Sequence, residues 1–342
     1  MILRPTILLL VLFLPAWWVG IATASEEGDP LIFDDVPLKD MIEHPDWFKE
    51  SFLDLQDDLQ EAVENGKRGI IVYFGQKRCP YCRQLMEINF KQPDIVKYTR
   101  DNFDVIAIDI WNPEEVTDPL GNTMTQRDYA LKMGTNFTPS LVFYDRDGNI
   151  ALRLRGYYPP YQFRAALEYV ADEHYKRERF NVYLARGDST LRFEAEDMVE
   201  EDFFLPPPYN LDRSRFPGER PLAVFFEQGN CHACDILHTQ LLRQPAIQEL
   251  FGAFESIQLN RRSNDPVITP DGRRLSARQW ANTLGVFYAP TLIFFDENGR
   301  EIIRVDSVVH FFRLRNVLNY VLTKGYLSYP SFQMWRSVNR NR

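Results

Sequence analysis

The sequence has 342 residues, of which 45% are hydrophobic and 25% charged, and its formal net charge is −9. This length favours two domains over one, and the composition allows each domain to bury a hydrophobic core. The acidic balance argues against nucleic acid and anionic membrane as the main partners.

The first 24 residues have the pattern of a secretory signal peptide. Arg4 supplies a positive charge, residues 7–14 form an apolar core, and Ala22-Thr23-Ala24 is a small-residue cleavage site. Because the apolar run is short for a membrane span, we expect cleavage, with an uncleaved membrane anchor as the alternative. The mature chain, from residue 25 on, is therefore expected in the periplasm and away from the membrane.

Residues 48–62 carry the first regular pattern of the mature chain. Apolar residues at 48, 52, 55, 59 and 62 recur at helical spacing. They predict an amphipathic helix that starts near Pro45 and ends at Asn65-Gly66.

The rest of the first half shows apolar runs separated by turn signals. Thr125 to Asp128 resembles a capping box that opens a short helix, and Gly134 is suited to close that helix. Together the segments predict a βαβ unit followed by a ββα unit, with a mixed sheet between helices. Strands are predicted at 70–74, 103–109, 140–144 and 150–154, and helices at 79–89, 126–134 and 161–169.

The second half of the sequence repeats the first. Cys79 and Cys82 correspond to Cys231 and Cys234 at an offset of 152 residues. Six further residues recur at an offset of 151, and a capping box returns at 276–279. The pattern indicates an internal duplication with two domains, at 25–186 and 187–342. The six residues are Gly121, Gly134, Pro139, Asp145, Gly148 and Tyr169, and they match Gly272, Gly285, Pro290, Asp296, Gly299 and Tyr320.

The two copies differ in how they begin and agree in how they end. The segment before Pro221 replaces the first helix with something less regular. Both copies end on an aromatic tail, at 180–183 and 332–335, and we expect each tail to pack against its own domain.

All four cysteines of the chain fall into the two Cys-x-x-Cys pairs. Cysteines of exported proteins usually form structural disulfides, but none is left over here for that purpose. Each pair follows an apolar strand at the predicted start of a helix. A helix N-terminus favours the thiolate, which is the form that attacks disulfides.

The order of strand, Cys-x-x-Cys helix, strand, helix, X-Pro, hairpin and helix resembles the thioredoxin fold over residues 66–175 and 218–325. The resemblance implies an α/β protein of two tandem thioredoxin-like domains, each with a central mixed β-sheet flanked by helices. The first helix and the Cys-Pro-Tyr-Cys site are most similar to exported bacterial thioredoxin-like proteins of the SoxW type. Thr138-Pro139 and Ala289-Pro290 match the family's cis-proline, which lies in the substrate groove against the dithiol. A trans proline at the start of a strand is the alternative.

Within this resemblance, the first cysteine of each pair, Cys79 or Cys231, is the nucleophile. The second, Cys82 or Cys234, resolves the mixed disulfide. Arg78 and Arg83 are expected to favour the first thiolate, and His232 the second when it is protonated.

The sequence departs from thioredoxin itself at the first dithiol and at the second. No tryptophan precedes the first cysteine of either pair. Tyr73 and Phe225 stand where thioredoxin carries a buried acid, while Glu227 and Asp235 add negative charge near the second site. These departures leave open the direction of electron flow and the activity of the second dithiol.

Our leading hypothesis is an exported thiol–disulfide oxidoreductase that exchanges disulfides with periplasmic protein partners and a thiol electron donor, as a reductase or electron relay. It needs no cofactor or metal. The alternative is a non-catalytic module that binds copper(I) or a client protein, with the second site degenerate. A single zinc site is disfavoured because each pair belongs to its own repeat. Outside these sites, His238 is expected in a surface or packing role and His310 in a turn.

Overall fold

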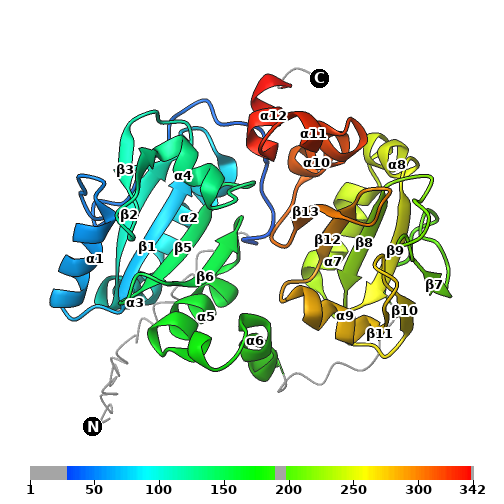
Figure 1. The fold of residues 1–342 in the computed structure, drawn as a ribbon, viewed down its shortest axis with the longest axis horizontal. Coiled ribbons are helices and arrows are strands. Elements are labelled where there is room, and N and C mark those ends of the chain that lie inside the picture. The colour runs from blue at the N-terminus through cyan, green and yellow to red at the C-terminus, as the bar shows by residue number, and fades with distance from the viewer. Residues whose placement is uncertain (1–28, 189–197, 340–342) are drawn as a thin grey trace, which may run out of the picture.

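The computed structural model describes residues 29–188 and 198–339, which form two α/β domains side by side (Figure 1). Each domain has a four-stranded sheet, in the order β2-β1-β5-β6 in the first and β13-β12-β8-β9 in the second. The predicted signal peptide, at residues 1–24, lies outside the described residues.

The first domain contains the predicted strands and helices, together with a small hairpin and two helices, at 93–102 and 180–188, that were not predicted. Strand β2 pairs with β1 in parallel, whereas β5 pairs with β1 and with β6 in antiparallel fashion, so the sheet is mixed as predicted. The elements are α1 (Leu55–Glu64), β1 (Gly69–Gly75), α2 (Pro80–Glu87), α3 (Pro93–Asn102), β2 (Phe103–Asp109), β3 (Glu115–Thr117), β4 (Thr123–Thr125), α4 (Gln126–Lys132), β5 (Ser140–Asp145), β6 (Ile150–Arg155), α5 (Pro160–Ala171) and α6 (Phe180–Asp188).

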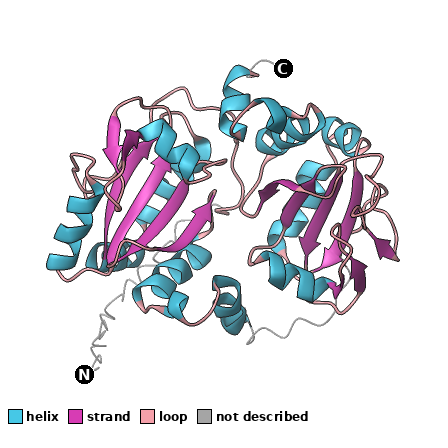
Figure 2. Cartoon of the chain, viewed as in Figure 1, coloured by secondary structure: helices cyan, strands magenta, loops and turns pink. Residues whose placement is uncertain are grey.

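Strand β1 is buried along its whole length because helices cover both faces of the sheet (Figure 2). Alternate residues of a strand point to opposite faces. Ile71 and Tyr73 therefore join a core with residues of α2, α3 and α5. Ile70 and Val72 join a second core with residues of α1 and α4. This double burial explains why the sequence of β1 is continuously apolar.

Helix α1 begins at Leu55 rather than near Pro45, so the predicted helix was too long. Asp54 caps its N-terminus by accepting from the backbone N–H groups of Gln56 and Asp57, and Leu53 before it has a φ of 64°. The predicted spacing joined residues of two separate cores. Phe48 packs near Tyr73 on one face of the sheet, whereas the α1 residues pack on the other.

The second domain repeats this architecture with a different beginning. The short strand β7 and the loops around it stand where the first domain has α1, as the irregular sequence predicted. The capping box at Ser276 and Gln279 is confirmed. The elements are β7 (Tyr209–Asn210), β8 (Leu222–Glu227), α7 (His232–Ile236), the π-helix η3 (Leu237–Leu242), α8 (Pro245–Phe251), β9 (Glu255–Asn260), β10 (Pro266–Ile268), β11 (Arg274–Ser276), α9 (Ala277–Leu284), β12 (Thr291–Phe295), β13 (Glu301–Val305), α10 (Phe311–Leu322), α11 (Gly325–Ser328) and α12 (Phe332–Val338).

The aromatic tails do not pack only against their own domains, which corrects the prediction. Phe180 of α6 packs against Phe287 of the second domain, with ring centroids 5.0 Å apart. Phe332 of α12 packs against Phe137 of the first domain at 5.4 Å. Both contacted residues lie just before the X-Pro bond of the other domain. Each tail therefore contacts its own core and the opposite domain, because its helix has more than one apolar face to bury.

The segment at residues 29–45, which we call the lead-in segment, also connects the domains. Its first residues lie between the two domains, as the dark blue trace in Figure 1 shows. Leu31 packs against the cores of both domains. Phe33 contacts the rings of Tyr81 in the first domain and His310 in the second, at 5.0 and 4.2 Å between centroids.

None of the helices in residues 29–188 and 198–339 is both long enough and apolar enough to span a membrane.

Candidate dithiol sites

The first dithiol lies where β1 ends and α2 begins. Cys79 is the N-cap of α2, and Pro80 occupies the first helical position, where its missing N–H costs no hydrogen bond. Cys79 and Cys82 form a disulfide with 5.2 Å between their Cα atoms. The backbone N–H of Cys82 donates to Cys79 Sγ at 3.0 Å. The fold thus points an unpaired donor of the helix N-terminus at the sulfur that we expect to be the nucleophile.

A chain of hydrogen bonds supports the same sulfur from the opposite side. The Thr138-Pro139 peptide bond is cis, as predicted, and Thr138 Oγ1 donates to Cys79 Sγ at 3.3 Å. Gln76 Nε2 donates to Thr138 Oγ1 at 2.7 Å, and Trp111 Nε1 donates to Gln76 Oε1 at 3.0 Å. Because Gln76 donates, the hydroxyl of Thr138 is left to donate to sulfur.

Gln76 and Trp111 were not among the predicted site residues. Each follows a β-strand at the edge of the sheet that carries the cysteines, after β1 and after β2. Their positions after these strands could have identified them as site residues, since loops at the carboxyl ends of parallel strands lie at the same edge of a sheet.

Tyr81, between the two cysteines, connects the first dithiol to the second domain. Its hydroxyl donates to Asp35 of the lead-in segment at 2.9 Å and accepts the backbone N–H of His310 at 2.9 Å. The Arg313 guanidinium lies 3.3 Å from the centroid of the Tyr81 ring, and its Nη2 donates to the carbonyl of Thr138 at 3.0 Å. The second domain therefore covers the first dithiol.

His310 is not a turn residue as predicted but the N-cap of α10, with 6% of its surface exposed. Burial lowers its pKa to about 4, although the charge of Asp35 acts in the opposite direction. The imidazole is thus held neutral at the domain interface.

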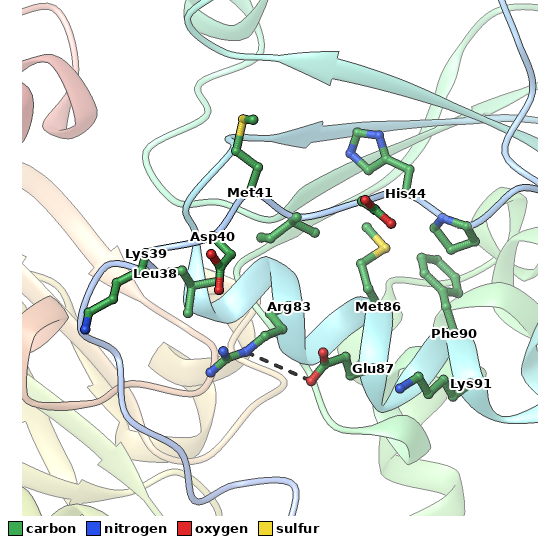
Figure 3. Close-up of a pocket in the computed structure, with 13 residues that line it drawn as sticks. Leu38, Lys39, Asp40, Met41, His44, Arg83, Met86, Glu87, Phe90 and Lys91 are labelled. Carbon is green, nitrogen blue, oxygen red and sulfur yellow. Dashed lines mark ion pairs between the residues drawn. The ribbon is translucent and has the colours of Figure 1, made fainter.

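Arg78 and Arg83 lie on the outer side of the first dithiol. The carbonyl of Arg78 accepts the backbone N–H of Leu38 from the lead-in segment, and its side chain is exposed. Arg83 lines a pocket of about 550 Å³ between α2 and the lead-in segment, where its Nε lies 4.0 Å from Glu87 (Figure 3). The expected influence of both arginines on the thiolate stays a prediction.

The second dithiol has the same backbone geometry with fewer supporting groups. Cys231 is the N-cap of α7, forms a disulfide with Cys234, and accepts the Cys234 N–H at 3.1 Å. The Ala289-Pro290 peptide bond is cis, as predicted, and the Ala289 carbonyl lies 3.5 Å from Cys231 Sγ. Ala289 has no hydroxyl to donate to this sulfur.

His232, the residue after Cys231, lies against the lead-in segment. Its Nε2 is 2.6 Å from Asp29. Burial raises the pKa of Asp29, but the hydrogen bonds from His232 and from the Leu31 N–H, together with the charge of His232, lower it below its ordinary value. Leu31 of the same segment shares a small cavity with Ala233 and Pro290. The lead-in segment therefore lies beside the second cis-proline.

His238, one turn after Cys234, is part of a buried ionic cluster. It is 1% exposed, with Nδ1 at 2.9 Å from Glu201 and Nε2 at 3.0 Å from Glu227. The packing alternative predicted for His238 is thus correct, but the two carboxylates were not foreseen. They raise its pKa against the effect of burial. In residues 29–188 and 198–339, no group of three His, Cys, Asp or Glu side chains is placed to hold a metal ion.

The chain belongs to the family defined by the thioredoxin-like domain, whose model matches it twice, at residues 55–171 and 210–322. Together the two matches cover about two thirds of the sequence. Both regions contain a Cys-x-x-Cys pair and a cis-proline beside it. The predicted fold class, two tandem thioredoxin-like domains, is confirmed.

Three solved structures similar to the chain each match about two fifths of it. A thioredoxin-fold protein from Helicobacter pylori is 22% identical, over 37% of this chain and 87% of its own, with a TM-score of 0.33. A thioredoxin from Thermus thermophilus is 22% identical, over 40% and 92%, with a TM-score of 0.29. A disulphide isomerase from Xylella fastidiosa is 16% identical, over 40% and 97%, with a TM-score of 0.24. A comparison with curated proteins finds no match.

Proposed function

We propose that the chain is a thiol–disulfide oxidoreductase and that Cys79 is its principal nucleophile. The observation that carries this proposal is the pair of donors at Cys79 Sγ, the Cys82 N–H at 3.0 Å and the Thr138 hydroxyl at 3.3 Å. Hydrogen bonds to a charged group favour the charged form, so both contacts stabilise a thiolate.

The reaction follows from this arrangement. In the reduced protein, the Cys79 thiolate attacks one sulfur of a partner's disulfide, and the other partner sulfur leaves as a thiolate. The Cys82 thiolate then attacks Cys79 Sγ and releases the partner as a dithiol. Two electrons pass to the partner, and the protein keeps the Cys79–Cys82 disulfide. A thiol electron donor restores the dithiol by the reverse exchange.

The second dithiol is proposed to take part in the same exchange as a relay. Cys231 occupies the N-cap of α7 and receives one donor, the Cys234 N–H. Without a hydroxyl at Ala289, we expect its thiolate to be less stabilised than that of Cys79. A difference between the two potentials would give electrons a direction between the domains.

A non-catalytic role for the second domain is the rival proposal, and one observation favours it. The lead-in segment lies against this site, with Asp29 on His232 and Leu31 beside Ala233 and Pro290. A site that already holds a segment of its own chain would serve to bind a partner rather than to exchange disulfides. Copper(I) bound by the dithiol is the other form of this proposal.

Export to the periplasm, with cleavage after Ala24, is part of the proposal. It is supported by the charge and apolar pattern of residues 1–24. In that compartment the proposed partners are thiol or disulfide proteins, and the protein would act as a reductase or relay of the SoxW type. The N-terminal residue of the protein recovered from the periplasm tests this: Ser25 is expected, and an intact N-terminus would contradict cleavage.

Two measurements test the redox proposal. In the Cys82→Ser variant, the mixed disulfide with a partner cannot be resolved, so partners should accumulate covalently on Cys79. Equilibrium potentials of the two sites are then measured separately, each with the other pair replaced by serine. A site that cannot cycle between dithiol and disulfide would be non-catalytic, and measurement of copper affinity would examine its alternative role.

A further inference from the structure

The lead-in segment binds the two domains through alternate side chains. The odd-numbered side chains from Asp29 to Asp35 are buried or half-buried, whereas the even-numbered ones from Ile32 to Val36 are exposed. This period of two is that of an extended chain, whose successive side chains point to opposite sides. Among the described residues, however, residues 30–37 form no backbone–backbone hydrogen bond with either domain. The segment is therefore held by its side chains, as a bound peptide ligand would be.

One end of this segment lies at the second dithiol site. Asp29 Oδ2 is 2.6 Å from Nε2 of His232, the residue after Cys231. Leu31 packs beside Pro290, where a cavity of only about 10 Å³ remains. This end of the site therefore accepts one carboxylate and, two residues later, an apolar side chain of about the size of leucine.

The other end of the segment lies at the first dithiol site. The Phe33 ring lies 5.0 Å from the ring of Tyr81 and 4.2 Å from that of His310, measured between centroids. Asp35 accepts from the Tyr81 hydroxyl and from two backbone N–H groups at the start of α10. A helix N-terminus stabilises a carboxylate at this position. This end therefore accepts an aromatic side chain and, two residues later, a second carboxylate.

Pro37 brings the segment close to the expected nucleophile. Pro37 and Cys79 line the same cavity of about 150 Å³. The Leu38 N–H donates to the carbonyl of Arg78 at 3.2 Å. Bond lengths then place the Cα atoms of Pro37 and Cys79 within about 8 Å of each other. Because a disulfide joins Cα atoms about 4.4–6.8 Å apart, a small backbone shift would let a sulfur at position 37 reach Cys79.

The lead-in segment also restricts access to the first dithiol. Cys79 is only 3% exposed, although the proposed function requires it to meet the disulfide of a protein partner. Asp35 and Pro37 form part of the lining of the cavity beside it. A partner that approaches through this cavity must therefore displace the lead-in segment.

We propose that residues 29–37 occupy the docking site of the protein partner. The partner enters as an extended segment with a carboxylate, an apolar, an aromatic and a second carboxylate side chain at alternate positions. Its disulfide cysteine follows two residues after the last carboxylate, at the position of Pro37. The inference rests on the proposed redox function of Cys79 and identifies the class of protein partner. The second domain binds the first half of the same segment at His232 and Pro290.

The exchange with this segment balances in atoms and electrons. The Cys79 thiolate attacks the partner cysteine that lies at the position of Pro37, and the other sulfur of the partner's disulfide leaves as a thiolate. Cys82 then attacks Cys79 Sγ and releases the partner segment. Two electrons and the two thiol protons of the protein pass to the partner, which leaves as a dithiol. The lead-in segment then returns to its site over the Cys79–Cys82 disulfide.

A synthetic peptide with the sequence of residues 29–38 tests the docking step without sulfur chemistry. It carries a fluorescent label at its C-terminus, and its binding to the oxidised protein is followed by anisotropy. The lead-in segment of the protein competes with the peptide, because a tethered segment acts at an effective concentration on the order of millimolar. Phe33→Ala in the protein removes the ring contacts of this competitor and leaves the docking site unchanged.

We expect the peptide to bind the Phe33→Ala protein about tenfold more tightly than the unmodified protein. Ile32→Ala is the matched control, since it removes an exposed apolar side chain from the same segment, and it should bind the peptide like the unmodified protein. A control peptide has the residues at positions 33 and 34 interchanged. It keeps the composition but turns the aromatic ring to the outer side, so it should bind none of the three proteins detectably.

A second measurement tests the exchange and needs no lead-in variant to fold. The peptides now carry Pro37→Cys as a mixed disulfide with 5-thio-2-nitrobenzoate, whose release is followed by absorbance. The reduced protein carries Cys231→Ser and Cys234→Ser, so only the first dithiol reacts. We expect the peptide with the native order to react about tenfold faster than the interchanged peptide.

Reaction of both peptides at the same measurable rate would overturn the inference, as would equal affinities of the peptide for the Phe33→Ala and Ile32→Ala proteins. A dimer of the unmodified protein that the peptide dissociates would also overturn it, because the site would then hold the lead-in segment of a second copy. Failure of the proposed function looks different: the native-order peptide would still bind, but Cys79 would react with neither peptide.

Discussion

Asp35 is the residue whose loss should uncover the first dithiol most directly. Its carboxylate is 6% exposed and accepts three hydrogen bonds: from the Tyr81 hydroxyl at 2.9 Å, the Phe312 N–H at 3.0 Å and the Arg313 N–H at 2.8 Å. The last two belong to the N-terminus of α10, where a negative charge is stabilising. One side chain therefore joins the lead-in segment, the dithiol loop and the second domain.

Asp35→Ala should weaken this junction by about 3 kcal/mol. Each buried donor left without an acceptor costs about 1–3 kcal/mol, and water that enters the site recovers part of that cost. At about 1.4 kcal/mol for each factor of ten, the population with α10 detached from Tyr81 should rise roughly a hundredfold. Cys79 should then become more accessible by a comparable factor.

The rate at which iodoacetamide alkylates Cys79 measures this opening. The protein is reduced and carries the Cys231→Ser and Cys234→Ser changes. Asp35→Asn keeps an acceptor oxygen and should give an intermediate rate. Asp34→Ala removes a neighbouring exposed carboxylate and should react like the unmodified protein. Alkylation of Asp35→Ala at the unmodified rate would refute the idea that this junction covers the dithiol.

Three further predictions concern single side chains. Thr138→Val should slow alkylation of Cys79 at neutral pH about fivefold, because the hydroxyl donor to sulfur is lost, while Thr138→Ser should restore it; an unchanged rate in the valine variant would contradict the role given to the hydroxyl. His310 is neutral in the folded and unfolded chain above pH 6.5, but below that pH the unfolded chain takes up the proton first, since burial lowers the folded pKa to about 4. Stability to urea should therefore fall by about 3 kcal/mol between pH 6.5 and 4, and His310→Gln should remove much of this loss; equal losses in both proteins would contradict the assignment. The contribution of His238 to stability depends on pH in the opposite direction, because its carboxylate partners raise its folded pKa despite burial. This contribution is complete below pH 6.5 and is lost as pH rises through the folded pKa. Urea midpoints of the second domain should thus decline on the alkaline side in the unmodified protein and stay flatter in His238→Gln, and parallel curves would argue against the cluster.

The strands and the cysteine-bearing helices could be predicted because their signals are local. The apolar run before Cys79 and the one before Cys231 specify buried strands, and the proline after Cys79 suits the first turn of a helix. Because the two halves repeat, each element predicted in one half was also predicted in the other. The predicted helix was wrong around Phe48, because helical spacing of apolar residues does not show which core each residue joins.

The sequence by itself determined two thioredoxin-like domains, their dithiols and the cis-prolines beside them. The apolar runs, the cysteine spacing and the repeat are read directly from the chain, whereas the fold and the cis-prolines were expected from the family resemblance, since Thr138 lies 59 positions from Cys79. Only the tertiary structure decided that Arg313 covers Thr138, that Asp35 joins Tyr81 to α10, and that the lead-in segment lines the path to Cys79. These contacts join residues more than 40 positions apart. They depend on how two finished domains pack, and no periodicity in the chain encodes that packing.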